Sequence, residues 1–65
     1  TPHRYILDRR LEHARHLLAT SDLQVRDIGQ RVGFHDAVSF CRRFRREVGR
    51  TPSDYRRQHA LHFLI

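Results

Sequence analysis

Residues 25–48 read VRDIGQRVGFHDAVSFCRRFRREV, and this stretch decides which fold the sequence predicts. Apolar residues recur at helical spacing from Val25 to Val32, which predicts a short helix. Gly33 is suited to the left-handed conformation that ends a helix, and Asp36 is a favourable N-cap for the next one. The second helix is then expected to run to Val48, where Gly49 provides its stop.

Two helices joined by a turn of a few residues have the spacing of a helix-turn-helix. Gly29 has no side chain at the place where the two helices must cross closely, and Gly33 permits the tight turn. The small core beneath this corner is predicted from the apolar residues of both helices and the turn, namely Ile28, Val32, Phe34, Phe40 and Phe44.

Outward from this corner, the rest of the chain also predicts helices. Thr1-Pro2 suits an N-cap followed by proline in the first turn, and a long amphipathic helix then extends to Thr20-Ser21-Asp22. Its core-facing residues are Leu7, Leu11, Ala14 and Leu18, and its apolar face is widened by Tyr5, Ile6 and Leu17. Thr51 to Asp54 resembles a capping box that opens a short fourth helix. The prediction is an all-α fold: a small, homeodomain-like helix-turn-helix bundle preceded by a long helix.

On a helical wheel, in which successive residues are 100° apart, the helix predicted over residues 37–48 has two different faces. Phe40, Phe44 and Val48 define its buried side. Both phenylalanines are therefore predicted to pack in the core and not to stack with nucleic-acid bases. Its exposed side carries small residues first and arginines afterwards, which suits a helix that enters the major groove of duplex DNA. The residues predicted to read bases are Ala37, Val38, Ser39, Cys41 and Arg42. Those predicted to bind phosphates are Arg43, Arg45 and Arg46.

The charge balance points to the same class of partner. The chain has 13 basic and 7 acidic residues and a formal net charge of +6, and all of its basic residues are arginines. Residues 36–65 contain seven arginines and three acids, against six and four in residues 1–35. Such a surface favours polyanions, and the second half is the expected contact region.

Other function classes find little support. The single cysteine, Cys41, excludes a disulfide within the chain, and no nucleophile, base and orienting group form a catalytic set. The pairs His13/His16 and His59/His62 lack the cysteine or acidic third ligand that a zinc site recruits. We therefore expect no enzyme, no metal and no cofactor. No apolar run suits a membrane helix, so a soluble protein is expected, and the single cysteine fits a reducing compartment such as the cytoplasm.

Four motifs in order resemble the AraC/XylS family of bacterial transcription regulators. Residues 10–18 are similar to the family's R-L-x-x-A-x-x-L-L, and residues 28–34 to I-A-x-x-x-G-F, with Gly29 in place of the commoner alanine. Residues 40–45 match F-x-R-x-F-[KR], and residues 49–56 match G-x-[ST]-P-x-x-Y-R, whose last residue, Arg56, we add to the predicted phosphate contacts.

This resemblance implies a DNA-binding domain with two helix-turn-helix units joined by a long linker helix. Residues 1–57 would be the linker helix and the second unit, and residues 58–65 a C-terminal tail. Residues 1–5 and 51–55 share the pattern T-P-x-x-Y, which favours a duplicated unit whose first copy lies outside this chain. An effector domain is expected further towards the N-terminus. Ala37 and Val38 are apolar where many family members have polar residues, which favours contact with thymine methyl groups.

A different kind of function remains open on the residues alone. The apolar side of the first helix and the apolar tail could bind RNA polymerase or a neighbouring regulator domain. A protein interface of this kind should tolerate neutralisation of Arg42, Arg45 and Arg46, whereas a DNA interface should not.

Overall fold

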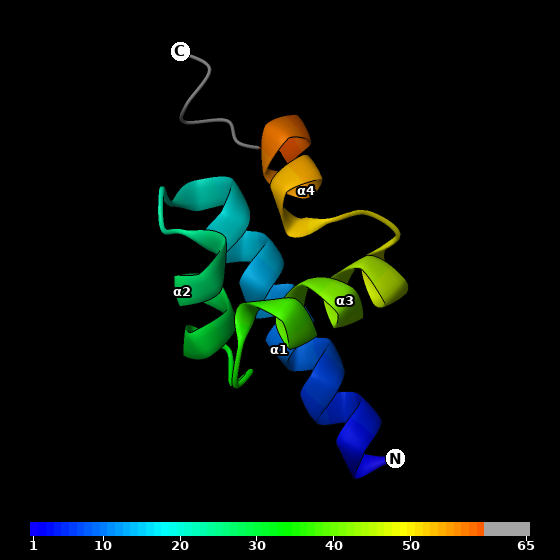
Figure 1. Ribbon diagram of the computed structural model, residues 1–65. Helices are drawn as coiled ribbons and strands as arrows, with labels where there is room; N and C mark the ends of the chain where they lie inside the picture. The colour runs from blue at the N-terminus through cyan, green and yellow to red at the C-terminus, as the bar shows by residue number, and fades with distance from the viewer. Residues whose placement is uncertain (60–65) are drawn as a thin grey trace.

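The computed structural model describes residues 1–59, and within them the chain forms helices and no strand. The helices are α1 (Pro2–Thr20), α2 (Val25–Arg31), α3 (Ala37–Val48) and α4 (Pro52–His59). In Figure 1, α3 crosses in front of the long α1, α2 lies beside them, and α4 lies near the C-terminal end of α1. The predicted all-α architecture, with a long helix leading into a helix-turn-helix, is confirmed.

The long helix α1 begins and ends where its sequence predicts. The Thr1 hydroxyl accepts a hydrogen bond from the Arg4 backbone N–H at 3.2 Å, so one of the N–H groups left free at a helix start is satisfied. At the other end, the backbone N–H of Ser21 donates to the Leu17 carbonyl at 3.0 Å.

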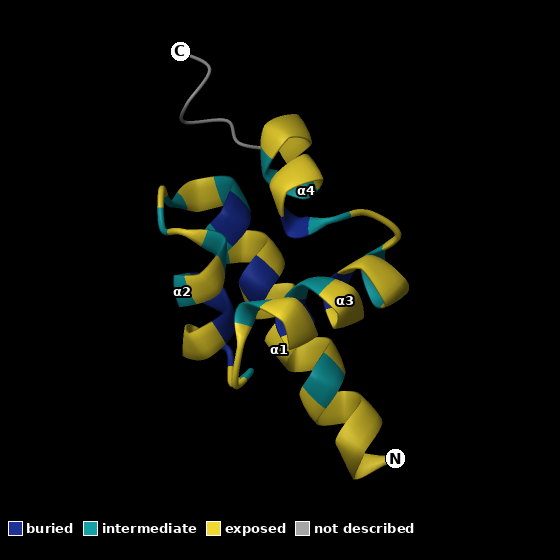
Figure 2. Ribbon diagram, viewed as in Figure 1, coloured by how far each residue is buried: buried dark blue, intermediate teal, exposed yellow. Residues whose placement is uncertain are grey.

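The core lies between the inner face of α1 and the corner made by α2 and α3. Its buried members are Leu11, Ala14, Leu18, Ile28, Val32, Phe40 and Phe44. Figure 2 shows these buried segments turned toward the centre of the bundle, with exposed residues around them. The widened apolar face of α1 is less buried than we expected, because Tyr5 and Ile6 are 66% and 46% exposed.

Aromatic side chains join α3 to its neighbours on both sides. The Phe34 and Phe40 ring centroids lie 5.4 Å apart, and those of Phe40 and Phe44 lie 5.7 Å apart. Phe44 also meets Tyr55 of α4 edge to face at 5.7 Å, a preferred geometry for aromatic pairs. Phe40 and Phe44 have no exposed surface, which confirms that they are packing residues.

The two glycines of the corner have the roles predicted for them. A Cβ atom on Gly29 would lie 3.0 Å from Cβ and Cγ of Phe40, so α2 and α3 cross closely and a side chain there would require Phe40 to shift by a few tenths of an ångström. Gly33 has a φ of +103°, in the left-handed region that favours glycine. The Phe34 N–H donates to the Gly29 carbonyl at 2.8 Å, which closes the turn.

The fourth helix keeps half of the predicted capping box. The Asp54 N–H donates to the Thr51 hydroxyl at 3.2 Å, while the Asp54 carboxylate contacts the Arg57 guanidinium at 3.5 Å. Because α4 continues to His59, the first two residues of the predicted tail are helical. The remainder of that tail, with its apolar residues and His62, lies outside the described residues.

Candidate nucleic-acid interface

The start of α3 is fixed by Asp36, which precedes the helix in an extended conformation. Its carboxylate accepts a hydrogen bond from the Ser39 backbone N–H at 2.7 Å and another from the Ser39 hydroxyl at 3.2 Å. This cap lets the chain enter the helix at Ala37, so that the residues predicted to read bases occupy its first turns.

The outward face of α3 has the composition predicted for it. Val38 is 60% exposed, and Ser39 and Arg42 are exposed beside it. Ala37 and Cys41 are half-buried, at the boundary between this face and the core. The structure therefore brings all five predicted base-reading residues onto the outer or boundary side of one helix.

The arginines near the end of α3 are all exposed, and within residues 1–59 none of them forms an ion pair. They are Arg42, Arg43, Arg45 and Arg46. Their charges are therefore not neutralised by the protein and remain available to an anion. Arg45 and Arg46 also favour the helix, because they lie in its last turn and cations there interact well with the helix dipole.

Three of these arginines border one shallow hollow of about 310 Å³. Phe34 of the turn and Ser39 of the first turn of α3 complete its lining, together with Arg42, Arg43 and Arg46. The three guanidinium groups suit a phosphate, which accepts charge-assisted hydrogen bonds from arginine. From the sequence we predicted Phe34 as a core residue only. Its place at this hollow was missed, because a helical wheel drawn for one helix does not include the turn before it.

Arg56 has a different position from the one predicted. Its Nε donates to the Leu18 carbonyl at 3.2 Å and its Nη2 donates to the Ser21 carbonyl at 3.3 Å. The half-buried side chain thus satisfies carbonyls at the C-terminus of α1, which have no partner within that helix. Since this guanidinium is engaged in joining α4 to α1, we do not include Arg56 in the proposed DNA surface.

Cys41 shows no sign of an activated thiol. Burial raises the pKa of its thiol, which keeps the side chain neutral and unreactive at physiological pH. Within residues 1–59, no group of three or more histidine, cysteine or acidic residues could hold a metal ion. The same residues include no helix long and apolar enough to cross a membrane.

Replacing Asp36 by alanine is expected to lower the thermal unfolding midpoint by roughly 5 °C at neutral pH, because the helix loses its cap. The hydrogen bond from the Ser39 backbone N–H holds the pKa of Asp36 below its ordinary value, with a further contribution from the Ser39 hydroxyl. The stabilisation is therefore present above the unfolded pKa of about 3.9 and is lost as pH falls through the lowered folded pKa.

Circular dichroism melts of the two proteins across this pH range measure the effect. The gap between their midpoints should close in acid. A gap that persists unchanged well below the folded pKa would contradict the role given to the ionised carboxylate.

Comparison with known proteins gives consistent matches. Residues 1–58 match the family described as "Helix-turn-helix domain". The chain is 47% identical over 55 residues to the "Uncharacterized HTH-type transcriptional regulator YijO" of Escherichia coli, covering 85% of this chain and 19% of that protein. It is 48% identical over 56 residues to the E. coli "HTH-type transcriptional activator RhaS", covering 86% and 20%. It is 42% identical over 60 residues to the "Transcriptional activator NphR" of Rhodococcus, covering 92% and 18%.

One solved structure also matches closely. It is the C-terminal domain of the two-component response regulator yesN from Fusobacterium nucleatum, with a TM-score of 0.81 and 37% sequence identity. The match covers 83% of this chain and 52% of that domain's chain. The chain spans about a fifth of the length of the curated relatives that it matches, at 18 to 20%.

Proposed function

Because this chain belongs to the AraC/XylS-type family of helix-turn-helix domains, we propose that it binds duplex DNA by placing α3 in the major groove. One observation carries the proposal: α3 buries Phe40 and Phe44 completely, while its other face presents small side chains and arginines that have no ion-pair partner among residues 1–59. A helix of this kind is held firmly on one side and is free to enter a groove on the other.

The first turns of α3 would face the base edges. Ala37 and Val38 suit contact with thymine methyl groups. The Ser39 hydroxyl, whose proton is donated to Asp36, can accept a hydrogen bond from a base. Cys41 is small enough to let the helix approach. Arg42 can donate two parallel hydrogen bonds to O6 and N7 of guanine, the commonest specific contact in this groove.

The remaining arginines of α3 would bind the phosphates that flank the groove. The hollow beside Phe34 would receive one phosphate between Arg43 and Arg46, and Arg45 lies further round the helix for another. Contacts of this kind fix the protein's register on the duplex but carry no sequence information directly. They should also make binding sensitive to salt, because each neutralised phosphate releases counterions.

Single substitutions separate the two roles. Against a duplex enriched from a random library by the unaltered chain, Arg42→Ala should lower discrimination over a scrambled duplex by about tenfold. Arg46→Ala should instead weaken both duplexes by about the same factor. Fluorescence anisotropy on labelled duplexes measures both ratios, with circular dichroism as a control for folding. Indistinguishable effects of the two substitutions would count against these assignments.

We further propose that the intact protein is a bacterial transcription regulator acting in the cytoplasm, and that a preceding helix-turn-helix covers Tyr5 and Ile6. The two T-P-x-x-Y copies support this, because Tyr55 packs against Phe44 of the unit before it while Tyr5 is 66% exposed. An effector domain would precede that unit, in the part of the regulator that this chain does not span.

The exposed Tyr5 and Ile6 also support a second candidate function, in which this face binds RNA polymerase or another regulator domain. A protein contact there leaves the arginines of α3 without a role. Neutralising those arginines would leave partner binding unchanged under this alternative. Nothing among the described residues suggests catalysis, and the named relatives are transcription regulators.

A further inference from the structure

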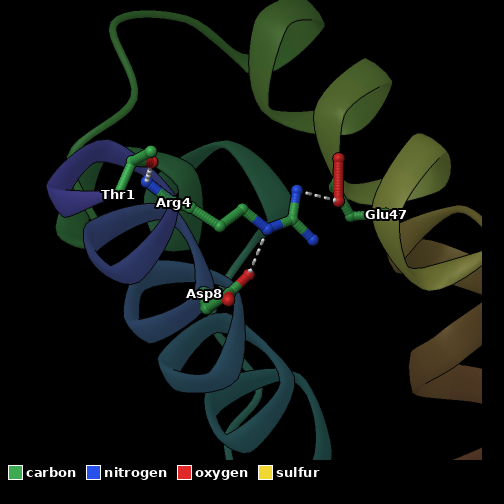
Figure 3. Close-up of polar contacts among 4 residues, drawn as sticks. All are labelled: Thr1, Arg4, Asp8 and Glu47. Carbon is green, nitrogen blue, oxygen red and sulfur yellow. Dashed lines mark hydrogen bonds and ion pairs between the residues drawn. The ribbon is translucent and has the colours of Figure 1, made fainter.

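An ion pair joins the first turn of α1 to the last turn of α3. The Arg4 Nη1 and Glu47 Oε2 atoms are 2.8 Å apart, and the Arg4 Nε also contacts Asp8 Oδ1 at 3.2 Å (Figure 3). The Glu47 side chain is only 15% exposed, whereas those of Arg4 and Asp8 are 55% and 57% exposed. The hydroxyl of Thr1 holds the Arg4 backbone at the same place.

We propose that the Arg4–Glu47 ion pair is a positioning contact that sets how α3 lies in the DNA groove, so that both residues determine binding specificity without touching DNA. The inference rests on the proposed DNA binding by α3. It assigns a function to Glu47, an acid that follows the arginines of the proposed DNA-binding helix and whose side chain is turned away from solvent.

The packing of α3 explains why its C-terminal end needs such a contact. The first half of the helix is held by the closed turn at Gly33 and by the close crossing of Gly29 with Phe40. Beyond Phe44, only half-buried side chains face inward. A groove of about 210 Å³ remains between this end of α3 and α1, and it is bordered by Arg4, Asp8, Leu11, Glu12, Arg15, Glu47 and Val48. The ion pair bridges this groove, whose border is charged apart from the buried Leu11 and the half-buried Val48.

Small movements at this end matter for base reading. A helix of 12 residues is roughly 18 Å long, so a tilt of about 5° about its first turn moves its free end by about 1.5 Å. Arg42, near the midpoint of the helix, moves by about 0.7 Å. Specific contacts require functional groups to be held within about 0.5 Å and 10–20° of the productive geometry. If α3 could tilt freely, its flexible arginines would still reach the phosphates. Arg42, however, could no longer align its two parallel hydrogen bonds with guanine.

Charge alone makes a different prediction, which allows a clear test. Glu47→Gln removes a negative charge and Arg4→Gln removes a positive one, so pure electrostatics should strengthen binding to every duplex in the first case and weaken it in the second. A positioning role predicts that both substitutions lower discrimination, whatever they do to overall affinity. Asp8→Asn is the matched control, because it changes the charge as Glu47→Gln does and also removes a carboxylate from Arg4, but leaves α3 untouched.

The experiment measures, by anisotropy, the affinity ratio between the enriched duplex and its scrambled counterpart for each variant. We expect this ratio to fall about fivefold in Arg4→Gln and Glu47→Gln, and to stay unchanged in Asp8→Asn. Arg4→Lys, which keeps the charge and can still reach Glu47, should retain most of the discrimination. Thermal melts should change little, since partly exposed ion pairs add little stability.

Affinities that shift in opposite directions with unchanged ratios would overturn the inference and leave the proposed function standing. An unaltered chain that shows no duplex binding would overturn both.

Discussion

Replacing Phe44 by alanine is expected to leave this chain largely unfolded at room temperature. The Phe44 ring has no exposed surface and packs at 5.7 Å against both Phe40 and Tyr55, so its loss opens a cavity where α3 meets α4. Truncation of a buried phenylalanine costs about 3–5 kcal/mol. A single core in a chain of this size supplies little more than that, so the substitution should remove most of the net stability.

Thermal melts followed by far-ultraviolet circular dichroism measure this effect. Val38→Ala is the matched control, because it shortens an apolar side chain on the same helix that is 60% exposed, and it should leave the melt nearly unchanged. Phe44→Leu should be intermediate, since leucine refills part of the cavity. A cooperative transition near the unaltered midpoint in Phe44→Ala would show that the core is held together elsewhere.

The double substitution Arg42→Ala/Arg46→Ala is expected to weaken binding to the enriched duplex about 100-fold at low salt. The loss combines one specific contact to a base with one contact to a phosphate. Both side chains are exposed and border the same hollow, so the fold should be unaffected. Fluorescence anisotropy with labelled duplex measures the affinity.

A control with the same change in charge is provided by Arg9→Ala/Arg57→Ala. Both residues are exposed and neither belongs to α3. Under the proposal this control loses only long-range attraction, a few-fold effect at most. Equal losses in the two double variants would mean that net charge, and not the face of α3, attracts DNA.

The parts of the fold that were predictable from sequence depend on neighbours within a few residues. The caps at Thr1, Asp36 and Thr51 each join a side chain to the backbone three residues later, so their signals are local. The end of α3 at Gly49 also depends on a local signal, because the backbone there has a φ of +95°, which glycine adopts readily. The outward face of α3 followed from helical periodicity alone.

Contacts between distant parts of the chain were not predictable in this way. Arg56 was predicted as a phosphate contact because it ends a family motif, but the fold brings its guanidinium to the carbonyls that end α1. Glu47 could be placed on the inner side of α3 by periodicity, yet nothing in its spacing identifies Arg4 as its partner. Tyr5 and Tyr55 occupy matching motifs but differ in burial, because within the described part of the chain only Tyr55 has a phenylalanine ring packed against it.

The most direct test of DNA docking by α3 is the salt dependence of duplex binding by the unaltered chain and by the Arg42→Ala/Arg46→Ala variant. Each phosphate neutralised contributes about −0.9 to the slope of log K against log salt concentration. We expect a steep slope for the unaltered chain and a slope that is shallower by about one unit or more for the variant. Parallel slopes, or no binding by the unaltered chain even at low salt, would contradict DNA docking by α3.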